Sequence, residues 1–164
     1  MTALLNSFYN TFSHDVTGYV LLIARSAEHR KVAVVRKTKP SWQAGRFNFP
    51  GGKIEARESP LTAAIRENIE EVGIAYAPCD LRPVAVLAKD GEFEVFVFAV
   101  ESEKVVNSIS KTEERVSLLD TLELRLMGRE RGIENLAWLY GMAFDGYAKC
   151  ARIEYADSQA NRTT

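Results

Sequence analysis

The sequence is poor in the side chains that build disulfide frameworks and zinc sites. Its 164 residues include two cysteines, Cys79 and Cys150, and two histidines, His14 and His29. Two cysteines this far apart make neither a zinc-ligand pattern nor a disulfide framework. We therefore expect both thiols to be reduced and structural, which suits a cytoplasmic location. We assign no role to the isolated histidines.

Long apolar runs and an excess of one charge are also missing. The formal net charge is −1, which argues against extended binding to nucleic acid or to an anionic membrane. No apolar run is long enough to cross a bilayer, and the N-terminal segment MTALLNSFYNTF lacks the features of a signal peptide. Without internal repeats or a linker, residues 1–164 are predicted to form one domain with its core at about 16–148.

β-branched and apolar runs separated by turn residues predict a set of strands. They cover residues 16–25, 32–37, 80–88, 92–100 and 116–119. Residues 26–30 are expected to turn one hairpin, and Asp90-Gly91 favours the backbone twist of a second. The strand at 92–100 becomes apolar on both faces, which is typical of a sheet covered on both sides.

Residues 61–72 are predicted to form a helix. Ser59 suits its N-cap, Pro60 suits its first turn, where a missing N–H costs nothing, and Gly73 suits its C-terminal end. The apolar stripe is expected to contain Leu61, Ala64, Ile65, Ile69 and Val72, interrupted by Asn68.

Two more helices are expected after the last strand. Asp120 should cap one that ends near Met127, and a longer one should cover 133–148. The apolar face of the longer helix would contain Leu136, Leu139, Tyr140, Ala143, Phe144 and Tyr147. The tail from about Tyr155 is polar. Together these elements predict an α/β fold with a mixed sheet between helices.

The helix at 61–72 carries the chemical signal. Glu67, Glu70 and Glu71 are spaced i, i+3 and i+4 and therefore share a face. Their mutual repulsion destabilises the helix by a few tenths of a kcal/mol per pair, and a hard cation offsets it. Ligands that are all oxygen indicate Mg²⁺ or Mn²⁺ rather than zinc.

The residues around this helix resemble the Nudix box, GX5EX7REUXEEXGU, in which U is a bulky apolar residue. Every fixed letter is present, at Gly52, Glu58, Arg66, Glu67, Glu70, Glu71 and Gly73. Ile74 fits the last U, whereas Asn68 departs from the first. The lead-in segments VAVVRK and RFNFPGGKIE are also similar to the family, and the resemblance covers roughly residues 17–145.

The resemblance implies a Nudix-type α/β/α sandwich with a loop–helix–loop catalytic motif, and hydrolysis of a nucleoside diphosphate linked to another moiety. It implies catalytic roles for Glu67, Glu70, Glu71 and Arg66. The metal ligands it implies are the Gly51 carbonyl and the carboxylates of Glu67, Glu70 and Glu71, with Glu58 reaching metal through water. Glu58 and Arg66 also match a pair that holds the motif together.

Metal ions in such a site polarise phosphorus and lower the pKa of a bound water, whose proton a carboxylate accepts. We favour Glu70 or Glu71 as that base, or a late acid, for which Glu113 and Glu114 are candidates. The competing interpretation of this late pair is that of solvated loop charges.

The sequence defines the substrate less well. Markers of ADP-ribose and dinucleoside polyphosphate hydrolases are absent, because their positions read Leu87-Ala88-Lys89 and Asp90-Gly91-Glu92. We therefore favour a MutT-like enzyme that cleaves a (d)NTP to a nucleoside monophosphate and pyrophosphate. One alternative is a hydrolase of ADP-ribose, a dinucleoside polyphosphate, a nucleotide sugar or a dinucleotide cofactor. A second is a nucleotide-sensing Nudix module without catalysis, against which the intact carboxylates argue.

Aromatic, amide and cationic residues near the box are candidates for contacting this small-molecule partner. They are Arg36, Arg46, Asn48, Trp42 and Trp138. Their competing interpretation is as core, rim or surface salt-bridge residues. A homodimer is left open.

Overall fold

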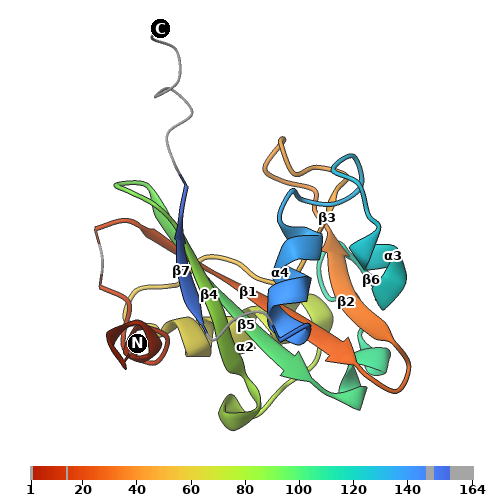
Figure 1. The fold of residues 1–164 in the computed structure, drawn as a ribbon, viewed down its shortest axis with the longest axis horizontal. Helices are drawn as coiled ribbons and strands as arrows, with labels where there is room; N and C mark the ends of the chain where they lie inside the picture. The colour runs from red at the N-terminus through yellow and green to blue at the C-terminus, as the bar shows by residue number, and fades with distance from the viewer. Residues whose placement is uncertain (1, 14, 147–149, 156–164) are drawn as a thin grey trace, which may run out of the picture.

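The computed structural model describes residues 2–13, 15–146 and 150–155. Within them, seven strands form one sheet in the order β3-β2-β1-β5-β4-β7, with β6 paired to β2 (Figure 1). The strands are β1 (Thr17–Ser26), β2 (Lys31–Arg36), β3 (Phe47–Asn48), β4 (Arg82–Lys89), β5 (Phe93–Glu101), β6 (Arg115–Asp120) and β7 (Ala151–Glu154). The sheet is mixed, because β1 pairs with β5 and β4 with β7 in parallel, and the other pairs are antiparallel.

Helices cover both faces of this sheet. They are α1 (Thr2–Ser7), α2 (Pro60–Val72), α3 (Thr121–Arg125) and α4 (Leu136–Phe144), with 3-10 turns at Pro78–Asp80 and Glu103–Asn107. Alternate residues of β1 point to opposite sides: Val20 and Leu22 join the core under α2, and Ile23 joins the core under α4. Figure 1 shows α4 in front of the sheet and α2 behind it. The predicted α/β/α sandwich is confirmed.

Both predicted hairpins and the predicted helix ends are present. The antiparallel pairs β1–β2 and β4–β5 confirm the two hairpins. Ser59 Oγ accepts the N–H of Thr62 at the start of α2, and Asp120 accepts the N–H of Leu122 at the start of α3. Gly73 ends α2 in the left-handed conformation, with φ of 77°, which glycine adopts without steric cost.

The apolar stripe of α2 differs from the prediction at two positions. Ile69 is 44% exposed, and Asn68 is 1% exposed. Asn68 Nδ2 donates to the carbonyl of Ile74 at 2.6 Å, so its amide ties the end of α2 to the following segment. A polar residue serves at the first U position because it satisfies a buried backbone carbonyl there.

Three short elements were missed by the sequence analysis: α1, β3 and β7. Behind α1, Phe8 is fully buried and meets Phe96 and Phe98 edge to face at 5.2 and 5.1 Å. The Phe8 carbonyl accepts the N–H of Leu61, and the backbone carbonyl of Glu58 accepts the N–H of Phe12. The core therefore begins earlier than residue 16, and the N-terminal segment packs against the box loop.

Both helices after β6 are shorter than predicted. α3 ends at Arg125, and α4 covers Leu136–Phe144. α4 stops before Gly146, which has φ of 76°, a backbone that does not continue a helix. The predicted positions Tyr147 and Ala148 lie outside the described residues.

The exposure of one cysteine differs from the prediction. Both cysteines are free, but Cys79 is exposed, so the structural role expected for it is wrong.

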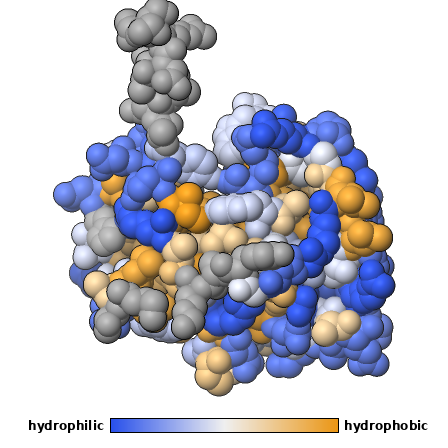
Figure 2. All heavy atoms as spheres, viewed as in Figure 1, coloured by the Kyte–Doolittle hydropathy of each residue, from blue (hydrophilic) through white to orange (hydrophobic). Residues whose placement is uncertain are grey.

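Figure 2 shows hydrophobic side chains gathered at the edge of one face, over α3, where Leu122 and Leu126 are exposed. A homodimer stays a prediction. Among the described residues, no helix combines the length and apolarity needed to cross a bilayer.

Candidate active site

Arg66 connects α2 to the loop that precedes it. Its guanidinium binds both carboxylate oxygens of Glu58, at 3.0 and 2.9 Å, and donates to the carbonyl of Lys53 at 3.0 Å. Burial opposes the charged form of Glu58, but the hydrogen bonds from Arg66 and from the N–H of Glu55 hold its pKa below the ordinary value. A bidentate pair of this kind fixes geometry as well as charge. The arrangement indicates a positioning role for Arg66.

The other donors of Arg66 reach two of the three carboxylates on α2. Nη1 lies 2.8 Å from Glu67 and 3.3 Å from Glu70. Glu67 and Glu71 are shielded from solvent, whereas the side chain of Glu70 is 55% exposed. Burial raises the pKa of Glu67 and of Glu71, against the opposing attraction of Arg66 and Lys37. The site thus holds two shielded carboxylates beside an accessible one.

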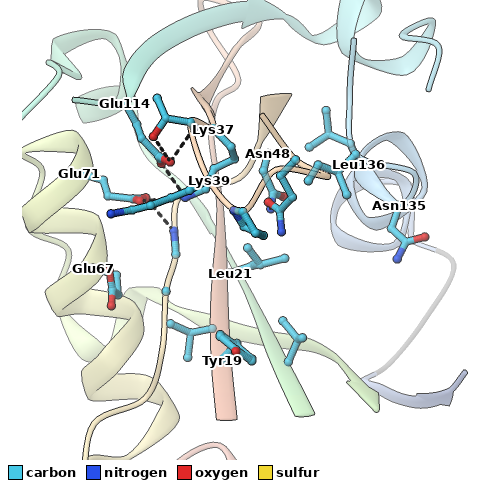
Figure 3. A pocket seen from close by; sticks show the side chains of 18 of the residues that line it. Tyr19, Leu21, Lys37, Lys39, Asn48, Glu67, Glu71, Glu114, Asn135 and Leu136 are labelled. Atoms are coloured by element: carbon cyan, nitrogen blue, oxygen red, sulfur yellow. Dashed lines mark hydrogen bonds and ion pairs between the residues drawn. The ribbon is translucent and has the colours of Figure 1, made fainter. Parts of the chain in front are cut away.

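Lys37, at the end of β2, lies between α2 and the loop before β6. Its Nζ is 3.3 Å from Glu71 Oε1 and 2.6 Å from Glu114 Oε2 (Figure 3). Glu114 also accepts the N–H of Thr38 at 3.0 Å. Burial by itself would lower the pKa of Lys37, but the two carboxylates outweigh it and raise that pKa. Of the two candidates for a late acid, Glu114 is buried beside Lys37 and is therefore not a solvated loop charge.

The glycine turn before α2 brings backbone close to these carboxylates. The N–H of Gly51 donates to Glu71 Oε2 at 2.9 Å. A Cβ at Gly52 would overlap the carboxylate of Glu67. The missing side chain of Gly52 therefore lets the Glu67 carboxylate lie directly against the turn.

The three carboxylates of α2 and Glu114 open onto one cavity of about 790 Å³. Glu67, Glu70, Glu71, Glu113 and Glu114 line its acidic end. Figure 3 shows Glu67 and Glu71 on one side and Asn135 and Leu136 of the α4 region on the opposite side. Such a cavity, with converging charged groups at one end, has the size of a small-molecule site.

The end of the cavity away from the acids is mostly apolar, and we call it the far end. Its walls come from β1, β4, β5, α4 and the residue after β7: Leu21, Leu87, Phe93, Val95, Ile133, Leu136, Leu139 and Tyr155. Asn135 is a polar group in this wall, and its Nδ2 donates to the hydroxyl of Tyr155. An apolar chamber with isolated polar groups suits a planar organic ring.

The predicted substrate-binding residues divide between the cavity and other surfaces. Asn48 and Trp42 line the cavity. Arg36 instead donates to the carbonyl of Gly45 at 3.1 Å. Arg46 and Trp138 are not among the described residues that line the cavity, and Trp138 is 48% exposed on α4. Arg36, Arg46 and Trp138 therefore lie outside the described lining of the cavity, and their contact with substrate stays a prediction.

Sequence reasoning missed several lining residues: Lys37, Lys39, Gln43, Asn135 and Tyr155. The end of β2 was visible in the sequence, but nothing local indicates that Lys37 reaches two acids far along the chain. Asn135 offered a weak signal, since an amide just before a helix is usually interpreted as a cap.

The arrangement fits a divalent metal ion. Lys37 already occupies a cation position between two shielded carboxylates, and all three glutamates of α2 line the cavity. The donors are oxygens, which Mg²⁺ and Mn²⁺ prefer. A second acidic group, Glu28, His29 and Glu103, lies outside the lining of this cavity and is exposed.

Comparison with known proteins identifies the family. The model of the NUDIX domain matches residues 15–139. Two curated relatives, each named 8-oxo-dGTP diphosphatase, come from Proteus vulgaris (39% identical over 54 residues) and Escherichia coli K12 (43% over 47 residues). These matches cover 33% and 29% of this chain, and 48% and 36% of the relatives. The chain therefore aligns with half or less of each relative's length.

Solved structures agree on the fold. One MutT structure, from work on the Aliivibrio salmonicida and Vibrio cholerae proteins, is 19% identical with a TM-score of 0.60, covering 77% of this chain and 95% of that one. The mutator MutT protein of Bacillus halodurans is 18% identical with a TM-score of 0.60, covering 86% and 91%. With the complete box on α2 and a domain match over most of its length, the chain belongs to the Nudix family.

Proposed function

We propose that this protein is a metal-dependent pyrophosphohydrolase that cleaves a (d)NTP to a nucleoside monophosphate and pyrophosphate. One observation carries the proposal: the carboxylates of α2 and an apolar chamber share a single cavity. A phosphate chain at the acidic end would place the nucleoside toward the far end. The names of the two curated relatives support an oxidised purine nucleotide as the first substrate to test.

The residues that would hold Mg²⁺ or Mn²⁺ are Glu67, Glu70, Glu71 and the carbonyl of Gly51, with Glu58 acting through water. When bound, the metal would polarise phosphorus and acidify a water. Among the three acids of α2, Glu70 is the exposed one, so it is the best placed to take a proton from solvent-derived water. Glu71 and Glu114 share Lys37 and are better suited to fixing charge near the phosphates.

Lys37 has a second use in this proposal. In the metal-free protein the Lys37 ammonium pairs with Glu71 and Glu114. Once metal is bound to the carboxylates, the ammonium would pair with phosphate oxygens of the substrate instead. The charge of Lys37 would then be paired in both states. Exposed Lys39 lies on the same rim and would add positive charge.

The experiment is a hydrolysis screen of the purified chain with Mg²⁺ and with Mn²⁺. The panel contains unmodified and oxidised (d)NTPs, ADP-ribose, diadenosine polyphosphates, NADH and nucleotide sugars, with products separated by chromatography. A monophosphate and pyrophosphate from one triphosphate class is the expected result. Preference for ADP-ribose or a dinucleotide would replace the proposed substrate, and metal-dependent binding without turnover would replace the proposed reaction with sensing.

A further inference from the structure

The strand β7 lies beyond residue 139, where the family match ends, and the residue that follows it, Tyr155, lines the cavity. β7 pairs in parallel with β4, from Ala85↔Ala151 to Ala88↔Glu154. The N–H of Tyr155 continues this ladder by donating to the carbonyl of Ala88 at 2.8 Å. Backbone pairing therefore places Tyr155 at the edge of β4.

A charged contact fastens β7 to the neighbouring part of the sheet. Arg152 Nη1 lies 2.7 Å from Glu94, whose side chain is 7% exposed. The ring of Tyr155 lies 6.0 Å from the ring of Phe93, tilted by 57°. These contacts hold an aromatic ring at the wall of the far end.

The side chain of Asn135, at the same wall, bonds to another side chain and not to the backbone of its helix. It occupies the N-cap position of α4, yet its side chain forms no capping hydrogen bond within the described helix. Its Nδ2 instead donates to the hydroxyl of Tyr155. An asparagine at an N-cap normally stabilises the helix by bonding its backbone. Here the helix lacks that stabilisation, and the amide is part of the cavity wall.

We propose that Tyr155 is a positioning residue that sets base specificity at the far end. The Tyr155 hydroxyl accepts one of the two hydrogens of Asn135 Nδ2, which fixes the orientation of the amide and leaves Oδ1 as an acceptor and the second N–H as a donor at set positions. A guanine-type edge, which places a ring N–H beside a carbonyl oxygen, matches this fixed acceptor and donor, whereas the adenine edge has its donor and acceptor in the opposite order. The ring of Tyr155 adds an apolar edge beside the base. This inference rests on the proposed function, since it concerns the nucleoside part of the same substrate.

The test compares Tyr155→Phe and Tyr155→Ala with wild type in the full chain, using Tyr9→Phe as the matched control. Tyr9 is exposed and outside the residues that line the cavity. In Tyr155→Phe the amide of Asn135 can rotate and offer either a donor or an acceptor. We expect KM for a guanine triphosphate to rise roughly 2- to 10-fold, as for one lost hydrogen bond, with kcat within about 2-fold.

The preference for guanine over adenine triphosphate should shrink by a similar factor in Tyr155→Phe. Tyr155→Ala should raise KM roughly 10- to 100-fold, because the ring contact is lost as well. Unchanged KM and unchanged base preference in Tyr155→Phe would overturn the inference, as would a fall in kcat alone. Thermal unfolding of each variant checks that the fold is kept.

Binding of guanosine monophosphate in EDTA, followed by calorimetry, separates this inference from the proposed function. If wild type hydrolyses nothing but binds the monophosphate more tightly than Tyr155→Phe, the proposed function fails and the inference holds. If hydrolysis proceeds and the two proteins bind the monophosphate equally, the inference fails and the proposed function stands.

Discussion

The two ends of the cavity are built in opposite ways. At the acidic end, charged groups are paired through a network centred on Arg66 and Lys37. At the far end, apolar side chains surround the amide–hydroxyl pair of Asn135 and Tyr155. The acidic end is therefore suited to charge and metal, and the far end to shape and a few hydrogen bonds.

The difference also extends to the chain itself. Most of the acidic end comes from residues 51–73, a loop and a helix that are continuous in sequence. The far end collects residues from β1, β4, β5, α4 and the residue after β7. A reaction that depends on a compact segment can persist while the remote walls, and with them the substrate, change.

The strongest way to break this comparison is to neutralise the acidic end. Glu70→Gln with Glu71→Gln should reduce turnover at least about 10²-fold, because metal binding and proton transfer both lose a carboxylate. Steady-state kinetics with Mg²⁺ measure the effect, and Glu130→Gln, an exposed acid outside the cavity lining, is the control. Unchanged turnover would show that the chemistry lies elsewhere.

Lys37→Met tests whether the ammonium acts as the resident cation. Without it, Glu71 and Glu114 lose their partner at low exposure, which costs about 3–5 kcal/mol in the metal-free protein. We expect a lower Tm in EDTA and a larger rise in Tm on adding Mn²⁺ than for wild type. Lys39→Met, on the exposed rim, should change neither. Equal Tm values for wild type and Lys37→Met in EDTA would contradict the pairing.

Asn68 separates the packing of α2 from its chemistry. Asn68→Ala removes the hydrogen bond to the carbonyl of Ile74 and should lower the free energy of unfolding by about 1–3 kcal/mol. Asn68→Leu, the type of residue usual in the box, loses the same bond but buries more apolar surface and removes the Oδ1 that has no hydrogen-bond partner among the described residues. We expect it to fall within about 1 kcal/mol of wild type. Denaturant unfolding measures both, and a larger loss for leucine would refute this account.

The smallest effect concerns an exposed carboxylate outside the cavity. Hydrogen bonds from Ser26 and His29 lower the pKa of Glu103 to about 2. A lowered folded-state pKa adds stability above the unfolded value, near 4.5, and that stability is lost as pH falls toward 2. Glu103→Gln should therefore flatten the pH dependence of unfolding between these values, and Glu28→Gln should not. Identical acid limbs for wild type and Glu103→Gln would count against the bond to Ser26.

Local signals explain what could be predicted from the sequence. The N-cap at Ser59, the left-handed end at Gly73 and the hairpin at Asp90-Gly91 depend on neighbours within a few residues. The spacing of Glu58 and Arg66 is also local, since one helix and one turn bring them together. These features were confirmed because the physics that determines them acts over short stretches of chain.

The rest depends on contacts that spacing cannot reveal. Ile69 fits an apolar stripe by periodicity, yet it is 44% exposed, and Asn68 is buried where its amide donates to the carbonyl of Ile74 beyond the end of α2. β7 is four residues long, too short for a pattern, and its pairing with β4 gives it a place. Tyr155 could not be assigned to the cavity from a segment that is polar in composition.

The parallel pairing of β1 with β5 carries a consequence for biosynthesis. Arg25 and Glu101, at the ends of these strands, are separated by 76 positions. A ribosome releases the β1–β2 hairpin, apolar on both faces, long before its central partner emerges. Until then the hairpin has unpaired edges that invite association with other chains. We expect the slow pairing of β1 with β5 to limit the folding rate. Cells that produce the protein quickly should therefore depend on holding chaperones more than they would for a sheet built of successive hairpins.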